Sequence, residues 1–207
     1  MGSSMSRTVE IRISNRTQNI TLRNPRTYES GFCTRSPRSE LRPSSTDTSH
    51  FVNSGRFCGI AGILVYEADS FTLAIYFSNP FDYNMYSIEL GLELSLSKAH
   101  VGSLAEIYAR MSKGTYSSSF VDAEFNRVIV EENQGIAWLN KGPIKVMATM
   151  SNTRNSTLKV MLEDQGGLNE EANMETHRNA AMRSENLQDP LWDLLVSPGT
   201  LKTLKHP

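Results

Sequence analysis

The chain has 207 residues, of which 39% are hydrophobic and 21% are charged, and its formal net charge is −1. This length and composition are those of a globular protein with one domain and a tail. The balanced charge excludes a strong basic field of the kind that recruits nucleic acid or anionic membranes, so membrane affinity must come from local contacts.

The first predicted element is a strand near the start of the chain. Val9, Ile11 and Ile13 alternate with polar residues, which is the pattern of a strand with one buried face. Asn15 to Asn19 are polar and turn-forming, so we expect the strand to turn back in a hairpin whose partner begins at Ile20.

A long irregular stretch and a buried strand come next. Residues 24–50 are rich in Pro, Arg, Ser and Thr and have little periodicity, which predicts a surface loop with one short strand near Phe32. Cys58 to Tyr66 form a nearly continuous apolar run, as expected for a strand buried on both faces. The apolar core of this run, Ile60 to Tyr66, is far shorter than the ~20 residues of a transmembrane helix.

The next strand leads into a loop of large apolar side chains. Phe71 to Ser78 alternate in the manner of a strand, and Asn79-Pro80 ends it because proline has no N–H for a ladder. The loop that follows carries three rings and a methionine, namely Phe81, Tyr83, Met85 and Tyr86. These side chains either fold back onto the sheet rim or form a wall for a cationic or amphipathic ligand head, since ring faces attract quaternary ammonium groups.

The remaining pattern is mostly strand. Ile88 to Ser97 alternate apolar with polar or small residues, which predicts a strand with one buried face. A short helix is predicted by the i, i+3, i+4, i+7 spacing of Leu104, Ile107, Tyr108 and Met111, with Ser103 as N-cap. Further alternating segments are residues 125–131, residues 135–139 running on to 144–150, and residues 158–162.

Many strands with a single short helix predict a mainly all-β domain. We expect an antiparallel β-sandwich flanked by one or two short helices. The predicted organisation is a short flexible leader over residues 1–7, the sandwich over residues 8–163, and a disordered tail over residues 164–207.

The run P-F-D-Y-N-M-Y-S from Pro80 to Ser87, preceded by T-L-A-I-Y-F-S, resembles the signature of the actinoporins, the sea-anemone-type pore-forming cytolysins, and of their vertebrate actinoporin-like relatives. The similarity extends over residues 7–163 in the order of the elements. It implies a β-sandwich that recognises phosphocholine or sphingomyelin head groups and forms pores, with cation leakage and haemolysis. It also implies a soluble, secreted protein that associates with a target-cell membrane and forms homo-oligomers there, although residues 1–6 contain no apolar secretory segment.

The resemblance also implies a set of binding residues. The positions that match the lining of the lipid head-group pocket are Ser30, Ile60, Ser78, Pro80, Tyr86 and Tyr108. A membrane-interface loop is implied for Phe81, Tyr83 and Met85. We expect the rings after Pro80 to stand outward and to meet Tyr108 of the short helix, leaving a concave seat for a cationic head.

The chain departs from the family pattern at several positions. Met85 replaces a tryptophan of the signature, Glu89 and Leu90 replace the tryptophan pair that follows, and Glu29 replaces an arginine before Ser30. Fewer rings weaken choline binding, so we expect an altered or weak head-group preference. Residues 1–7 would span only ~10 Å as a helix against a hydrocarbon core of ~30 Å, so we expect surface binding with little pore formation by this chain alone.

Other classes of function find less support in the sequence. No nucleophile, phosphate or metalloprotease motif is present and the four histidines are scattered, so we expect neither an enzyme nor a cofactor or metal site. Cys33 and Cys58 would pair only if the fold brings them together. The alternative is a lectin-like module that binds glycans, because fungal fruit-body lectins share this sandwich; a third is a scaffold without a ligand. Nucleic acid is not an expected partner.

Overall fold

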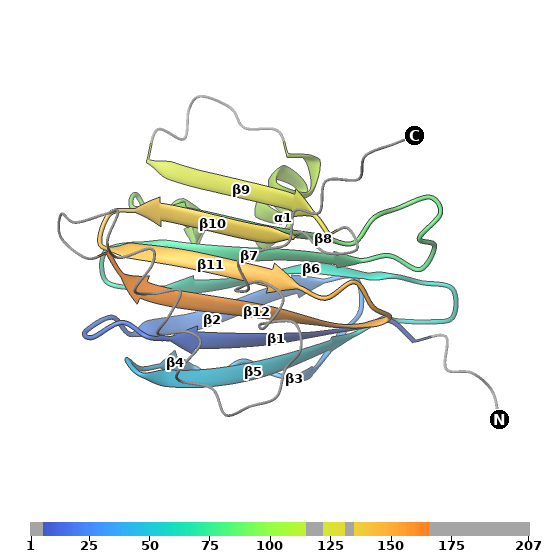
Figure 1. The fold of residues 1–207 in the computed structure, drawn as a ribbon, viewed down its shortest axis with the longest axis horizontal. Coiled ribbons are helices and arrows are strands. Elements are labelled where there is room, and N and C mark those ends of the chain that lie inside the picture. The colour runs from blue at the N-terminus through green and yellow to red at the C-terminus, as the bar shows by residue number, and fades with distance from the viewer. Residues whose placement is uncertain (1–5, 115–121, 131–134, 166–207) are drawn as a thin grey trace, which may run out of the picture. The chain divides into compact units, whose positions relative to one another are not determined.

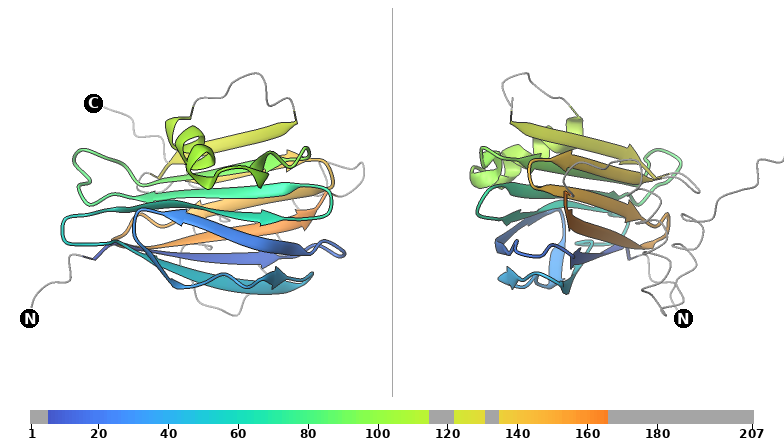
Figure 2. Two further views of the ribbon diagram at one scale, coloured as in Figure 1. Left: turned by 180° about the vertical axis from the view of Figure 1, so that it is seen from behind. Right: turned by 60° about the vertical axis from the view of Figure 1, so that its left-hand side comes forward.

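The protein is a β-sandwich. The computed structural model describes residues 6–114, 122–130 and 135–165. Within these residues, two six-stranded sheets pack face to face (Figure 1). The α-helix α1 (Leu104–Lys113) lies on the outer face of one sheet, which is clearest from behind (Figure 2, left). The expected antiparallel sandwich flanked by short helices is therefore confirmed.

The first sheet has one parallel pair in an otherwise antiparallel arrangement. β1 and β12 run parallel, with Thr8 opposite Asn155 and Asn15 opposite Leu162. The spatial order of the strands in this sheet is β10 (Ile136–Lys141), β11 (Ile144–Met150), β12 (Asn155–Asp164), β1 (Thr8–Asn15), β5 (Ser45–Val52) and β3 (Phe32–Arg35).

The second sheet is antiparallel throughout and carries the helix. Its order is β4 (Glu40–Leu41), β2 (Leu22–Glu29), β6 (Ile60–Glu67), β7 (Thr72–Asn79), β8 (Glu89–Ser95) and β9 (Ala123–Ile129). Alternate residues of both sheets meet between the layers in one apolar core, which includes Ile11, Phe51, Phe77 and Leu158. β1, which was predicted from alternation, buries its apolar face, and β6 is buried on both faces as its apolar run indicated. β7 is buried on both faces as well, although its residues alternate.

The predicted hairpin at the start of the domain is wrong. β1 pairs with β12 and β5, whereas β2 belongs to the opposite sheet and pairs with β4 and β6. The turn residues make a corner between the sheets instead. Asn15 Nδ2 donates hydrogen bonds to the carbonyl oxygens of Ile20 at 2.7 Å and Leu41 at 3.1 Å, and the Thr17 hydroxyl donates to Asn15 Oδ1 at 2.7 Å. Buried polar side chains therefore hold the corner.

The long loop predicted over residues 24–50 is also wrong, because β2, β3, β4 and β5 lie largely within it. β2 is interrupted by a register shift between Arg23 and Arg26, where Asn24 has a φ of 52° and Pro25 has no N–H. β3 is a short strand at a sheet edge whose residues are mostly exposed. The short strand expected near Phe32 is therefore confirmed, whereas the sequence pattern did not reveal β2, β4 and β5.

The segment 135–150 is a hairpin rather than a continuous run. β10 and β11 pair antiparallel, with Lys141 opposite Ile144. Gly142 sits in the turn with a φ of 64°, a left-handed conformation that suits glycine. The two strands keep the predicted alternation on either side of this turn.

The alternation of residues 88–97 predicted an exposed outer face for β8, but this face is covered. Glu93 and Ser95 have no exposed surface, because the 3-10 helix η1 (Ala99–Val101) and α1 cover the middle of this sheet. The predicted apolar face of α1 packs on this sheet: Leu104, Ile107, Tyr108 and Met111 meet Ile63, Val65, Ala74 and Tyr76. Ser103 is the N-cap residue, although its side chain makes no capping hydrogen bond.

A buried polar network joins this helical cover to the sheet. His100 Nδ1 lies 2.7 Å from the Thr72 hydroxyl, and His100 Nε2 lies 3.0 Å from Glu93 Oε1. Arg110 of α1 also pairs with Glu93, and Arg26 of β2 donates to the His100 carbonyl. Burial alone would raise the pKa of Glu93, but His100 and Arg110 hold that pKa below its ordinary value.

Two of the sequence predictions concern the ends of the chain. Residues 1–5 of the predicted leader and residues 166–207 of the predicted tail lie outside the described residues, and β12 ends at Asp164. Cys33 and Cys58 are both free thiols. No described helix has the length and apolar character needed to cross a membrane.

Candidate functional site

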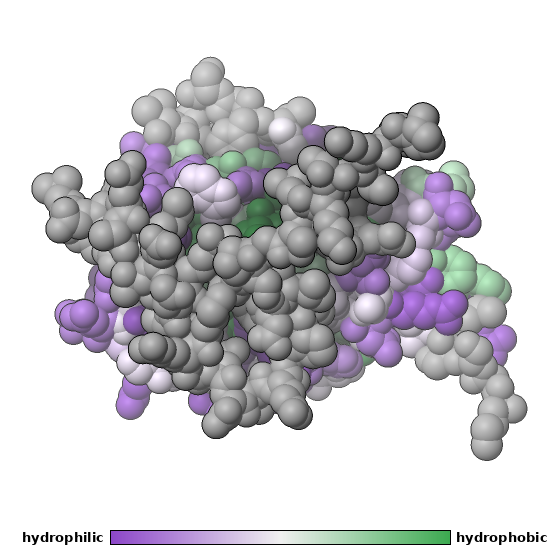
Figure 3. All heavy atoms as spheres, viewed as in Figure 1, coloured by the Kyte–Doolittle hydropathy of each residue, from purple (hydrophilic) through white to green (hydrophobic). Residues whose placement is uncertain are grey.

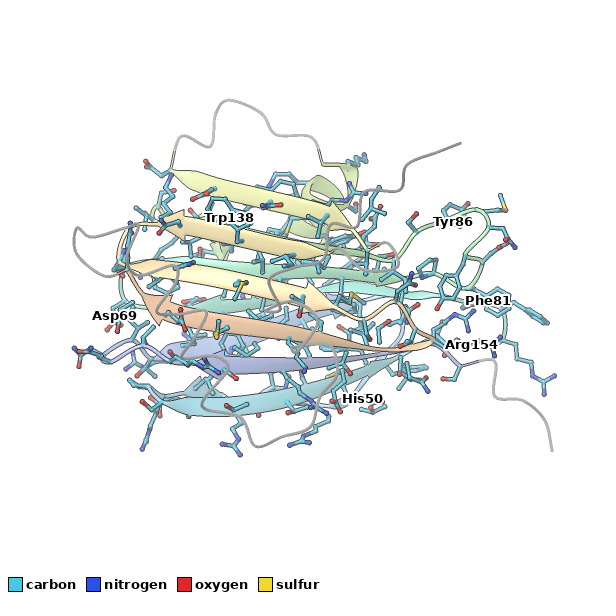
Figure 4. The ribbon with its side chains drawn as sticks, viewed as in Figure 1. His50, Asp69, Phe81, Tyr86, Trp138 and Arg154 are labelled. Atoms are coloured by element: carbon cyan, nitrogen blue, oxygen red, sulfur yellow. The ribbon has the colours of Figure 1, made fainter. Side chains whose placement is uncertain are left out.

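Three loops meet at one end of the sandwich. They are residues 53–59 between β5 and β6, residues 80–88 between β7 and β8, and residues 151–154 between β11 and β12. Figure 1 shows them on its right-hand side, next to the start of β1. Figure 4 places Phe81, Tyr86 and Arg154 at this end and Asp69 at the opposite end. We call this region the loop end.

A cavity of about 710 Å³ opens at the loop end. Five of the six predicted pocket residues line it: Ser30, Ile60, Ser78, Pro80 and Tyr86. Phe81, which was predicted for the membrane-interface loop, lines the cavity as well. The remaining lining residues are Ser54, Phe57, Cys58, Gly59, Ala61, Tyr76, Asn79, Asp82, Ser87, Glu89 and Arg127. The structure thus gathers residues of β6, β7, β8 and β9, two loops and Ser30, which directly follows β2, around one space.

The floor of the cavity is set by close backbone packing. Ser30 donates its N–H to the Ala61 carbonyl at 2.9 Å, and its hydroxyl oxygen accepts the Ala61 N–H at 3.0 Å. Ile60 is 1% exposed, so it supports the floor from the core. At Gly59 a Cβ would lie only 2.9 Å from the Asn79 carbonyl oxygen, so the two loops approach as closely as they do because this residue is glycine.

Tyr108 lies behind the cavity wall. It does not appear among the lining residues, and its ring packs against Tyr28 at a centroid distance of 5.4 Å and Tyr76 at 5.9 Å. The expectation that the loop rings meet Tyr108 is therefore wrong: Tyr76 stands between, because α1 covers the middle of the sheet while the loop extends past its end. Burial raises the pKa of both Tyr76 and Tyr108, so both phenols stay neutral.

The aromatic loop has an anchored part and a projecting part. Tyr83 is 41% exposed, and its hydroxyl donates to Asn79 Oδ1 at 2.9 Å. Met85 and Tyr86 project more, with 71% and 62% of their surface exposed. Of the residues predicted for the membrane-interface loop, Phe81 and Tyr83 therefore belong to its base and Met85 belongs to its tip.

The anchor is Arg7, which precedes β1 and was not singled out from the sequence. Its Nε donates to the Pro80 carbonyl at 3.0 Å and its Nη2 donates to the Phe81 carbonyl at 2.6 Å. The guanidinium also lies 5.0 Å from the Phe81 ring centroid and 4.9 Å from that of Tyr83. Arg7 is 5% exposed, so this cation is buried against two carbonyls and two rings.

Two asparagines connect the three loops. Asn79 Nδ2 donates to the carbonyls of Thr8, Thr153 and Arg154 at 3.0 to 3.1 Å, and it also contacts Ser156 Oγ at 3.0 Å. Asn53 accepts the Arg7 N–H through Oδ1 at 3.2 Å, and its own N–H donates to the Arg7 carbonyl at 3.0 Å. The loop end is thereby fastened to β1 and β12, which gives the cavity a fixed frame.

The charged wall of the cavity comes from two neighbouring strands. Glu89 on β8 and Arg127 on β9 form an ion pair, with Oε1 of Glu89 2.6 Å from Nη2 of Arg127. The Tyr76 hydroxyl donates to the other carboxylate oxygen of Glu89 at 3.1 Å. The sequence identified Glu89 only as a departure from the family pattern, and no local signal indicated that Arg127 would face it.

Apolar side chains surround the cavity mouth. Phe57 is 63% exposed, and its ring meets Phe81 edge-on at 5.3 Å. With Met85 and Tyr86 it forms what we call the apolar rim, and Figure 3 shows apolar residues beside polar ones at this right-hand end. Phe57 was not singled out from the sequence. The described residues contain no group of three or more His, Cys, Asp or Glu that could hold a metal ion.

The fold has a counterpart among solved structures. No model of a known protein family matches the sequence, and no curated protein matches it. The crystal structure of the lipid binding protein Nakanori is similar, with a TM-score of 0.56 and 13% sequence identity. The likeness covers 75% of this chain and 70% of that chain. At this identity the likeness shows a shared β-sandwich fold.

Proposed function

We propose that this protein binds membrane lipid through its loop end and receives a phosphocholine-type head group, as on sphingomyelin or phosphatidylcholine, in the cavity. One observation carries the proposal: the cavity and the apolar rim of Phe57, Met85 and Tyr86 lie at the same end. A membrane lipid offers both partners together, because its polar head is next to an apolar interface.

The apolar rim provides the membrane contact. Phe57 and Tyr86 are each more than half exposed, and aromatic side chains are favoured at the boundary between water and hydrocarbon. Burying a side chain of this size contributes about 1.5–3 kcal/mol relative to leaving it exposed. Three such residues on two anchored loops therefore support a reversible association with a bilayer surface.

The cavity provides the head-group contact. Tyr86 offers a ring face to a quaternary ammonium group, and the Glu89 carboxylate gives that part of the wall a negative charge. The hydroxyl of Ser78 and the guanidinium of Arg127 suit a phosphate. The fold shared with a lipid binding protein is a second, coarser support for lipid as the ligand class.

Sedimentation with vesicles tests the proposal. We expect the protein to pellet with vesicles that contain sphingomyelin or phosphatidylcholine, and Tyr86→Ala to weaken that binding about tenfold, since ~1.4 kcal/mol is one decade in affinity. Trp138→Ala is the matched control, because Trp138 is 54% exposed but lies on β10 away from the loop end (Figure 4). Retention on glycans without any vesicle binding would instead favour the lectin-like alternative.

Pore formation and assembly on the membrane remain predictions from the family resemblance. Release of an entrapped dye from the same vesicles measures permeabilisation, and chemical cross-linking on the vesicles measures homo-oligomer formation. Both assays are separate from head-group binding. A protein that binds the vesicles without releasing their dye therefore still fits the binding proposal. Secretion and the absence of catalysis are likewise predictions.

A further inference from the structure

We infer that the Glu89–Arg127 ion pair makes the cavity select zwitterionic lipid heads and reject anionic ones. This inference rests on the proposed lipid binding and concerns which head groups the cavity accepts. It names Glu89 as a specificity-determining residue, whose role is to occupy the one arginine in the cavity lining that would otherwise attract an anion.

The geometry shows that both oxygens of the Glu89 carboxylate are engaged inside the cavity. Oε1 lies 2.6 Å from Arg127 Nη2, and Oε2 accepts the Tyr76 hydroxyl at 3.1 Å. The Glu89 side chain is 18% exposed and that of Arg127 is 24% exposed. The pair is therefore partly shielded from water. Charges in such a position interact more strongly than charges at an open surface.

The charge of the lining disfavours an anionic ligand. The described lining residues include two acidic side chains, Glu89 and Asp82, and one basic side chain, Arg127. The formal sum is one negative charge. An anionic head would add a net negative charge beside two carboxylates, with one guanidinium in the described lining to offset them.

A zwitterionic head adds no net charge to this lining. Laid antiparallel to the ion pair, its ammonium faces Glu89 and its phosphate faces Arg127, so each protein charge meets an opposite charge. A guanidinium has five N–H donors, and the bond to Glu89 uses only Nη2, so the arginine can serve the carboxylate and a phosphate together. The ion pair then recognises the head-group dipole rather than its net charge.

Glu89→Gln isolates this role. Glutamine keeps the shape and an acceptor oxygen for the Tyr76 hydroxyl but removes the charge that occupies Arg127. The matched control is Glu10→Gln, because Glu10 on β1 also pairs with an arginine, Arg12, at 2.6 Å but lies outside the cavity. Arg127→Gln is a second variant, which removes the phosphate partner instead.

The experiment compares sedimentation of the 207-residue chain with phosphatidylcholine vesicles and with equimolar phosphatidylcholine–phosphatidylserine vesicles at low salt. For the unmodified protein and Glu10→Gln we expect tighter binding to phosphatidylcholine alone. For Glu89→Gln we expect the preference to reverse, with about tenfold weaker binding to phosphatidylcholine and about tenfold tighter binding to the anionic mixture. Arg127→Gln should weaken binding to phosphatidylcholine without any gain on the mixture.

The outcomes separate this inference from the proposed function. If the unmodified protein binds both vesicle types equally, or if Glu89→Gln leaves the ratio unchanged, lipid binding stands and the charge selection is overturned. If the unmodified protein pellets with neither, the proposed function fails and this inference fails with it. Protection against thermal unfolding by free phosphocholine but not by inorganic phosphate gives the same comparison without a membrane.

Discussion

Glu89 and Glu93 lie on the same strand and the same face, four residues apart, yet their surroundings differ completely. Glu93 has no exposed surface and pairs with His100 and Arg110 beneath the helical cover. Glu89 lies where that cover ends, and its carboxylate lines the cavity with Arg127. One repeating strand pattern thus supplies a buried structural carboxylate and an accessible one.

Stability and ligand binding therefore depend on different regions of the second sheet. The helix-covered middle of the second sheet holds its charges in a closed network, so changes there act on folding. The cavity wall and the apolar rim hold the Glu89 carboxylate and the exposed rings within reach of solvent, so changes there act on ligands. Arg7 at the base of the aromatic loop is buried and supports the fold. The substitutions below test this division, beginning with the largest expected loss of stability.

Glu93→Gln should cause the largest loss of stability. Removing this charge leaves His100 and Arg110 buried without their carboxylate, and breaking a buried pair costs about 3–5 kcal/mol. Urea denaturation measures the free energy of unfolding. Vesicle binding per folded molecule should stay as in the unmodified protein; a variant that folds normally but no longer binds would contradict the division.

Arg7→Met should have the next largest effect and should also loosen the loop end. The guanidinium donates to the carbonyls of Pro80 and Phe81, and hydrogen bonds from a charged group are each worth about 1.5–3 kcal/mol. Because the loop still has Asn79 and Asn53 as supports, we expect a loss of about 2 kcal/mol and faster hydrogen exchange at the Tyr86 amide, which donates to Asp82.

The control for Arg7→Met is Arg12→Met. Arg12 has a half-exposed side chain that pairs with Glu10, and exposed pairs contribute less than about 1 kcal/mol. An Arg7→Met protein with unchanged loop exchange, or an Arg12→Met protein with equal loosening, would remove Arg7 as the anchor.

Acid should weaken the helix-covered region through Glu93. Because the folded state lowers the pKa of this carboxyl, Glu93 stabilises the protein above its unfolded pKa of about 4.3, and that stability is lost as the pH falls through the lower folded value. Between about pH 5 and pH 3, the free energy of unfolding should fall more steeply for the unmodified protein than for Glu93→Gln. Parallel slopes would show that another group carries the acid sensitivity.

Glu89→Gln should have the smallest effect on stability. The pair is only partly shielded from water and glutamine keeps the Tyr76 hydrogen bond, so we expect a loss of about 1 kcal/mol in urea denaturation. A loss as large as that of Glu93→Gln would mean that Glu89 belongs to the folding network, and the comparison between the two glutamates would no longer hold.

The sequence predicted the elements whose burial follows a simple period. The apolar face of α1 was predicted because packing on one side leaves a helical pattern. β7, its end at Asn79-Pro80 and the ring-rich loop were predicted from the alternation of residues 71–78 and from the proline, although both faces of β7 are buried. Within residues 24–50 only the short strand near Phe32 was predicted. β2 was not, because it is interrupted near Pro25.

The candidate site was only partly predictable, because some of its residues are close together in the chain and others are distant in sequence. Ser78, Pro80 and Tyr86 are near one another in the chain, so a local signature identified them. Arg7 and Arg127 reach the loop end through pairings of strands distant in sequence, which no local pattern encodes. The burial of Glu93 also depends on η1 and α1 folding back over β8, so alternation alone placed that carboxylate on an exposed face.

Hydrogen exchange with and without sphingomyelin vesicles tests most directly which surface binds lipid. The account predicts slower exchange in residues 53–59 and 80–88 when vesicles are added, with no change in the turn between β6 and β7 at the opposite end, where Asp69 lies (Figure 4). Slower exchange confined to that opposite turn or to the β10–β11 hairpin would contradict the account.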